Sequence, residues 1–242
     1  MKKMLKKVKV NLASALAWIC GFSAFLLVSL SLLITGIVIN PRRFDGLIKA
    51  GCRFIMRMLF IRIRVEGREH VDPRRTYIFM CNHVNQFDGI VLYGYIPNFA
   101  RGVELDTHFK WFFWGWVLRR LEMIPISRTN ARSAMNSLMQ AKKAFARGIS
   151  IMIMPEGTRT LTGSFGAFKR GPFLLAKEAG ADIVPMVMIG AFEIKRKGSP
   201  ILRPGQMILR FGKPVLYSET CDLEADELKT LVRDKMLQLF EQ

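Results

Sequence analysis

The segment Ile149-Ser150-Ile151-Met152-Ile153-Met154-Pro155-Glu156-Gly157-Thr158-Arg159 shows most clearly which kind of fold this chain adopts. Its first six residues are apolar except for Ser150, and such a run is typical of a strand buried on both faces. Pro155 and Gly157 end the run and are typical of a turn. A buried strand over Ile149–Met154 that leads into a polar turn indicates an α/β sheet whose functional loops follow its strands.

The same arrangement occurs earlier in the chain, where the strand-like run Tyr77–Cys81 precedes Asn82-His83-Val84-Asn85-Gln86-Phe87-Asp88. The remaining pattern alternates between strands and helices. Further strands are predicted at Ile61–Val65, Met123–Ile126, Ile183–Ile189 and Met207–Phe211, and helices at Asn85–Tyr95, before Gly148, at Gly171–Ala179 and over the last twenty residues. This alternation predicts an α/β fold with a central mixed, largely parallel sheet covered by helices.

The N-terminal part of the chain has a different composition. Val10–Pro41 contains no charged residue, and a helix of about twenty apolar residues can cross the core of a bilayer. The alternative is a core helix of a soluble domain, but uncharged helices of this length are rare there. We therefore expect an N-terminal membrane-embedded helical segment, with membrane-anchoring helices in residues 1–60 and the α/β domain in residues 61–242.

Basic residues flank this segment on both sides, so the positive-inside rule gives no clear orientation. A full span would separate the N-terminal lysines from the α/β domain. Insertion into one leaflet would keep both basic flanks at the anionic cytoplasmic surface, where Phe44–Leu59 is predicted to form a basic amphipathic helix. We expect a membrane protein whose α/β domain lies on the cytoplasmic face, which in a bacterium would be that of the inner membrane.

The chain of 242 residues has a net charge of +18, which favours polyanionic partners such as nucleic acid, anionic lipid headgroups or phosphorylated cofactors. Its tryptophans and phenylalanines at 111–116 form one apolar block that suits lipid contact better than base stacking, so we expect no nucleic acid partner. The four cysteines are scattered and no close Cys/His cluster is present. We expect reduced cysteines and no metal site.

The motif after Tyr77–Cys81 supplies a base and a carboxylate. Asp88 follows His83 by five residues, and from the first turns of a helix its carboxylate can reach back to the imidazole. Such a carboxylate fixes the tautomer of the ring and stabilises its protonated form, so that His83 can act as a general base. By itself the spacing is also compatible with a histidine that only caps a helix.

The second motif favours an anionic ligand. Gly157 permits a tight turn with accessible N–H groups, Thr158 adds a hydroxyl, and the Arg159 guanidinium can hold a phosphate or carboxylate with two hydrogen bonds. Downstream, Lys169 adds positive charge at a predicted helix start. The alternative is an ordinary turn in which Glu156 and Arg159 pair with each other. Together the two motifs describe a site that takes a proton from an alcohol while it holds an anionic substrate.

With these motifs the chain resembles the glycerolipid acyltransferases, whose best-known members are the 1-acylglycerol-3-phosphate (lysophosphatidate) acyltransferases. Asn82, His83 and Asp88 match the family's asparagine-histidine and aspartate, and Pro155–Arg159 matches its proline-glutamate-glycine-threonine-arginine block. Ile124–Arg128 and Val184-Pro185 fit two further blocks. The order and the separations agree from about Ile61 to Phe211.

The resemblance implies that His83 takes the proton from a lipid hydroxyl, which then attacks the thioester of acyl-CoA or acyl-carrier protein. It implies that Asp88 orients His83 and that N–H groups near Gly157 stabilise the oxyanion. The resemblance further assigns Glu156 to the catalytic set and five residues to substrate binding: Asn82, Arg128, Thr158, Arg159 and Lys169. No bound cofactor is implied, and the expected partners are membrane lipids, a lysolipid acceptor and the acyl donor.

The identity of the acceptor stays open. Asp106 stands where the family often has a lysine, and a carboxylate there would repel a phosphate. The leading hypothesis is conversion of 1-acylglycerol-3-phosphate to phosphatidate. The alternatives are acyl transfer to another lysophospholipid or to an aminoacyl lipid, and a non-catalytic protein that binds membrane lipids.

Overall fold

The computed structural model describes residues 2–38, 40, 42–127 and 131–242. Within these residues seven strands form one sheet in the order β1-β7-β6-β2-β5-β3-β4. The strands are β1 (Ile61–Glu66), β2 (Ile78–Cys81), β3 (Ala100–Leu105), β4 (Ile124–Ile126), β5 (Ser150–Ile153), β6 (Ile183–Ile189) and β7 (Gly205–Phe211). Every neighbouring pair is parallel except β6 with β7. The prediction of a mixed, largely parallel sheet is therefore confirmed.

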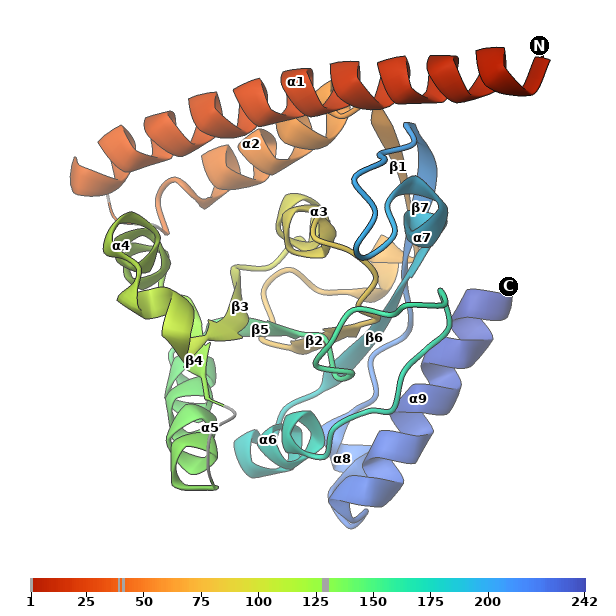
Figure 1. The fold of residues 1–242 in the computed structure, drawn as a ribbon. Coiled ribbons are helices and arrows are strands. Elements are labelled where there is room, and N and C mark those ends of the chain that lie inside the picture. The colour runs from red at the N-terminus through yellow and green to blue at the C-terminus, as the bar shows by residue number, and fades with distance from the viewer. Residues whose placement is uncertain (1, 39, 41, 128–130) are drawn as a thin grey trace.

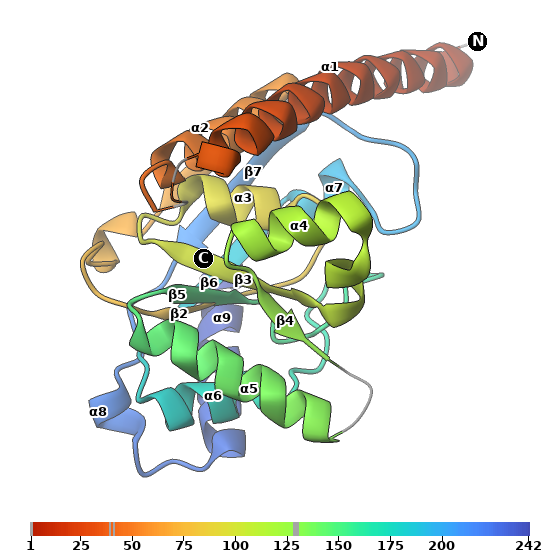
Figure 2. The ribbon, with the colours of Figure 1, turned by 90° about the vertical axis from the view of Figure 1, so that its left-hand side faces the viewer.

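Helices cover both faces of this sheet (Figure 1). The longer ones are α1 (Lys2–Val38), α2 (Asp45–Met58), α3 (Asp88–Tyr95), α4 (Phe112–Arg120), α5 (Ala131–Ala146), α6 (Gly171–Ala179) and α9 (Ala225–Glu241), and the short ones are η1 (Arg68–His70), η2 (Asp106–Lys110), α7 (Ala191–Ile194) and α8 (Tyr217–Thr220). Figure 2 shows α1, α2 and α3 on one side of the sheet and α5, α6 and α9 on the other. The result is a sheet with a hydrophobic core on each side.

Strand β2 illustrates why the central strands are apolar throughout. Ile78 and Met80 belong to the core beneath α5, α6 and α9, whereas Phe79 and Cys81 belong to the core beneath α1, α2 and α3. Successive side chains of a strand point to opposite faces, so a strand covered on both sides has no polar face. This arrangement places the polar residues of the two motifs at the strand ends, where the chain leaves the sheet.

Helices α1 and α2 run antiparallel and pack closely. A Cβ at Gly21 would collide with the Leu59 side chain, and a Cβ at Gly51 would lie 2.7 Å from Val28 Cγ1. One side of α1 contributes Ala17 and Ala24 to the core. Its other side exposes a row of large apolar side chains: Leu12, Leu16, Ile19, Phe22, Leu26, Leu27, Leu30 and Ile34. Val8–Leu32 is long and apolar enough to cross a membrane.

Strand β3 was not expected from the sequence, because Arg101, Gly102 and Glu104 break its apolar pattern. Arg101 is fully buried between the sheet and α2, where its Nη1 donates to Asp45 Oδ1 at 3.0 Å. The helix predicted from Asn85 begins instead at Asp88. Residues 85–87 form a turn whose backbone N–H groups bond to the side chains of Asn85 and Asp88 rather than to a helix.

Candidate active site

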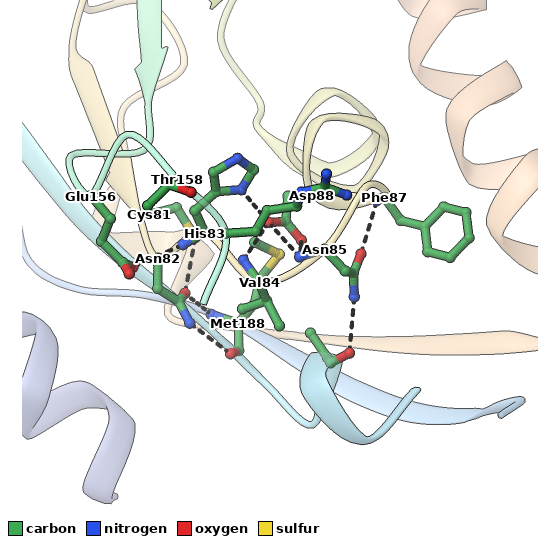
Figure 3. Close-up of polar contacts among 12 residues, drawn as sticks. Cys81, Asn82, His83, Val84, Asn85, Phe87, Asp88, Glu156, Thr158 and Met188 are labelled. Atoms are coloured by element: carbon green, nitrogen blue, oxygen red, sulfur yellow. Dashed lines mark hydrogen bonds and ion pairs between the residues drawn. The ribbon is translucent and has the colours of Figure 1, made fainter. Parts of the chain in front are cut away.

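His83 and Asp88 meet where β2 leaves the sheet (Figure 3). His83 lies two residues beyond the end of β2, and Asp88 is the first residue of α3. The distance between His83 Nδ1 and Asp88 Oδ2 is 2.8 Å. With the carboxylate ionised, Nδ1 carries the donated proton, and the lone pair of Nε2 is left to accept a proton from a substrate.

The surroundings of the two side chains differ. The Asp88 side chain is 2% exposed, whereas that of His83 is 26% exposed. Asp88 Oδ2 also accepts from the Val84 N–H at 2.6 Å, and Oδ1 accepts from the Asn85 N–H at 3.0 Å. Burial raises the pKa of Asp88, and the His83 hydrogen bond opposes that rise. Asp88 is therefore a fixed support for an imidazole that solvent can reach.

Glu156 connects the two motifs through the backbone. Its Oε1 accepts from the His83 N–H at 3.0 Å, and its Oε2 accepts from the Gly166 N–H at 2.7 Å. Glu156 is 3% exposed, and burial raises its pKa while the two backbone hydrogen bonds lower it. With both oxygens engaged in this way, Glu156 positions the histidine loop against the loop that follows β5.

The turn at Gly157 also lies directly against His83. Gly157 has φ +67°, a left-handed conformation that favours glycine, and its N–H donates to Met154 O at 3.0 Å. The Thr160 N–H donates to His83 O at 2.8 Å. The Gly157 N–H is thus used within the turn. The following N–H groups, those of Thr158 and Arg159, are the better candidates for an oxyanion.

Asn82 was expected among the substrate-binding residues, but its amide is occupied within the protein. It is buried, its Nδ2 donates to Met188 O at 3.1 Å, and its Oδ1 accepts from the Met188 N–H at 2.7 Å. These two bonds attach the end of β2 to β6. Asn82 therefore fixes the start of the histidine loop.

Two of the three basic residues expected at the site, Arg159 and Lys169, follow β5 and are at least partly accessible to solvent. Thr158 is exposed and Arg159 is half-buried. Lys169 is exposed, and its backbone N–H closes the loop through Pro155 O at 2.8 Å. Arg128 lies outside the described residues. Sequence reasoning missed Lys197, whose Nζ donates to Thr158 Oγ1 at 3.3 Å, because no local pattern connects two loops so far apart in the chain.

An apolar cavity of about 380 Å³ lies between α1, α2, α3 and α4. Gln86 and Gly89, on either side of the Phe87-Asp88 pair, line it together with Trp114 and Trp116 of the aromatic block. The other lining residues include Phe25, Val28, Leu32, Phe44, Ile48, Ile55, Ile90, Val117, Leu118 and Leu121. The cavity therefore reaches the start of α3, where Asp88 lies. Among the described residues, no three His, Cys, Asp or Glu side chains form a group that could hold a metal ion.

Comparisons with known proteins identify relatives of this chain. The chain is 27% identical to a chloroplastic 1-acyl-sn-glycerol-3-phosphate acyltransferase of Brassica napus, over 94% of this chain and 69% of that protein. It is 30% identical to the 1-acyl-sn-glycerol-3-phosphate acyltransferase of Pseudomonas aeruginosa, over 68% of this chain and 65% of that protein.

The crystal structure of the 1-acyl-sn-glycerophosphate acyltransferase of Thermotoga maritima has the same fold, with a TM-score of 0.82 and 20% identity over 96% of this chain and 95% of that one. A family model described as acyltransferase matches residues 62–189. That match covers more than half of the chain and includes both motif loops. This protein therefore belongs to the acyltransferase family.

Proposed function

We propose that this enzyme transfers a fatty acyl group from an acyl thioester to the free hydroxyl of 1-acylglycerol-3-phosphate and so forms phosphatidate. The observation that carries the proposal is the 2.8 Å contact between His83 Nδ1 and Asp88, which leaves Nε2 as a base beside the Pro155–Arg159 loop. The names of the relatives in Brassica napus and Pseudomonas aeruginosa support this choice of acceptor.

The reaction begins when His83 Nε2 takes the proton of the acceptor hydroxyl as that oxygen attacks the thioester carbonyl carbon. A C–O bond forms, and the carbonyl oxygen becomes an oxyanion that the Thr158 and Arg159 N–H groups stabilise. When the intermediate collapses, the C–S bond breaks and the protonated His83 returns its proton to the leaving thiolate. Asp88 stabilises the imidazolium between these two steps.

The binding groups divide by chemistry. Arg159, Lys169 and Arg128 would bind the acceptor's phosphate, because guanidinium and ammonium groups make charge-assisted hydrogen bonds to it. The apolar cavity between α1 and α4 would receive an acyl chain, because each CH₂ group that moves from water into it contributes about 0.8 kcal/mol to the binding free energy. No bound cofactor takes part. The donor is acyl-CoA or acyl-carrier protein.

Helix α1 suits insertion into one leaflet better than a full span. It is 37 residues long, and one of its sides packs on the domain from Ser14 to Val28. A helix perpendicular to the bilayer would carry the attached domain into the hydrocarbon core, whereas a helix along the surface buries only its exposed apolar row. The basic α2 and the catalytic domain then lie at the cytoplasmic face.

An acceptor panel tests the proposal. Purified enzyme in vesicles is given acyl-CoA or acyl-carrier protein and, in turn, lysophosphatidate, lysophosphatidylcholine, lysophosphatidylethanolamine and an aminoacyl lysolipid. We expect the highest kcat/KM with lysophosphatidate, and no turnover from His83→Ala protein that remains folded and membrane-bound. A higher kcat/KM with a zwitterionic acceptor would mean that the enzyme acylates that lipid and does not serve to make phosphatidate. Wild-type-like turnover by His83→Ala would exclude the mechanism.

A further inference from the structure

The loop between α7 and β7, residues 195–204, belongs to neither motif and lies outside the segment that the family model matches. It carries Lys195, Arg196 and Lys197 in succession. The Lys197 Nζ donates to Thr158 Oγ1 at 3.3 Å and to Arg159 O at 3.4 Å. Because Thr160 of the same turn bonds to His83 O at 2.8 Å, the Lys197 ammonium lies on the rim of the candidate active site.

Within the described part of the chain, the positive charge of this rim has no negative partner. None of the ion pairs between described residues includes Arg159, Lys195 or Lys197. Lys195 is 5% exposed, and burial followed by the charge of Arg159 lowers its pKa. Like charges held this close repel each other. An anion bound between the two loops would relieve that repulsion.

Both internal hydrogen bonds and contacts with α1 fix this loop. Lys195 Nζ donates to the carbonyl oxygens of Arg196 and Ser199 within the loop. On the other side, the Leu202 N–H donates to Ser14 Oγ at 2.9 Å and Trp18 Nε1 donates to Pro200 O at 2.9 Å. Both Ser14 and Trp18 belong to α1. The loop that carries the lysines is thus held by α1, and Lys197 contacts the turn at Thr158.

We propose that Lys197 is a further acceptor-binding residue, whose ammonium joins the Arg159 guanidinium in binding the phosphate monoester of the acceptor. This inference rests on the proposed function. A phosphate monoester carries close to two negative charges at neutral pH, and two cations from separate loops match that charge. The ammonium has three donors, of which Thr158 and Arg159 use two, so one N–H remains for a phosphate oxygen.

Steady-state kinetics of Lys197→Gln test this inference, with Lys213→Gln as the matched control. Lys213 is also an exposed lysine, but it follows the end of β7, which runs antiparallel to β6 and so ends at the opposite edge of the sheet from the site. The substrates are lysophosphatidate, monoacylglycerol as its phosphate-free counterpart, and acyl-CoA. Lys197→Arg keeps the charge and serves as the conservative variant.

We expect Lys197→Gln to raise the apparent KM for lysophosphatidate by roughly 5- to 20-fold, the range of a partly exposed charge-assisted contact. The preference for lysophosphatidate over monoacylglycerol, as a ratio of kcat/KM values, should fall by a similar factor. Lys197→Arg should recover most of the loss, and Lys213→Gln should behave as wild type. An increase in KM confined to acyl-CoA would overturn the inference and assign Lys197 to the donor's phosphates.

An unchanged KM for both substrates in Lys197→Gln would also overturn the role of Lys197 and leave the proposed function intact. If the wild-type enzyme itself does not acylate lysophosphatidate, the proposed function fails, and this inference fails with it.

Discussion

Replacing Asp88 by Asn tests the catalytic pair most directly. The Asp88 carboxylate accepts hydrogen bonds from His83 Nδ1 at 2.8 Å, the Val84 N–H at 2.6 Å and the Asn85 N–H at 3.0 Å. An amide of the same shape has only one oxygen for these three donors. Its NH₂ group faces a donor in either orientation, and it has no charge to stabilise the imidazolium of His83. We therefore expect Asp88→Asn to fold but to lose most of its turnover.

The size of the loss follows from the contact that changes. A hydrogen bond to an ionised partner contributes about 1.5–3 kcal/mol, and each 1.36 kcal/mol of barrier is about a tenfold change in rate. The missing charge alone then lowers kcat by roughly 10- to 150-fold. If the amide also holds His83 in the tautomer that carries its proton on Nε2, the loss approaches the ~10²–10⁴-fold that a general base contributes. The apparent KM for the acceptor should change little, because Asp88 is buried.

The assay follows thiol release from acyl-CoA at saturating lysophosphatidate, with circular dichroism to confirm folding. His83→Ala and the double variant His83→Ala/Asp88→Asn complete the comparison. Because Asp88 acts through His83, adding Asp88→Asn to His83→Ala should lower kcat hardly any further. A kcat for folded Asp88→Asn within about threefold of wild type, where ~10²-fold is expected, would refute the reasoning. An undiminished effect of Asp88→Asn in the His83→Ala background would show that the carboxylate acts independently.

Three further substitutions or reagents probe the surrounding structure. Glu156→Gln should lower both kcat and the thermal midpoint, because an NH₂ group replaces one oxygen that accepts from a backbone N–H. The free energy of unfolding should fall by about 1.5–3 kcal/mol, and an unchanged thermal midpoint would contradict the bridging role of Glu156. Gly51→Ala should destabilise the protein by about 1–3 kcal/mol despite the better helix propensity of alanine, because its Cβ meets Val28, and Val28→Ala should relieve the effect in thermal melts. N-ethylmaleimide should label exposed Cys221 and spare Cys81, whose pKa burial raises; labelling of Cys81 in folded protein, seen by mass spectrometry, would contradict this.

The apolar runs in the sequence were enough to predict that both motifs lie at the ends of buried strands. Strands buried on both faces read as continuous apolar segments, so Tyr77–Cys81 and Ile149–Met154 corresponded closely to β2 and β5. These two strands are neighbours in the sheet, and their polar ends therefore lie side by side. The contact between His83 and Asp88 was also predictable, because it connects residues of one short loop.

Contacts between distant segments were not predictable. Arg101 breaks the pattern of β3, and its burial depends on Asp45 of α2, which no local signal reveals. From the sequence, the oxygens of Glu156 could have faced Arg159 or a substrate. In the structure one of them accepts from the backbone N–H of Gly166, ten residues later. Lys197 reaches the site only because its loop folds back over Thr158. In each case the side chain's partner is set by tertiary packing.

The bonds of Asn82 and Glu156 also have a consequence for the order in which the site forms during folding. Glu156 holds the backbone of a residue 73 positions earlier in the chain, and Asn82 is held by a strand residue 106 positions later. Closing loops of this length costs conformational entropy, so such contacts form late in folding. We therefore expect the histidine loop of a chain growing on the ribosome to be fully anchored only after Met188 has emerged and β6 has paired with β2. We expect a fragment that ends before β6 to lack acyl transfer activity even though both motifs are complete.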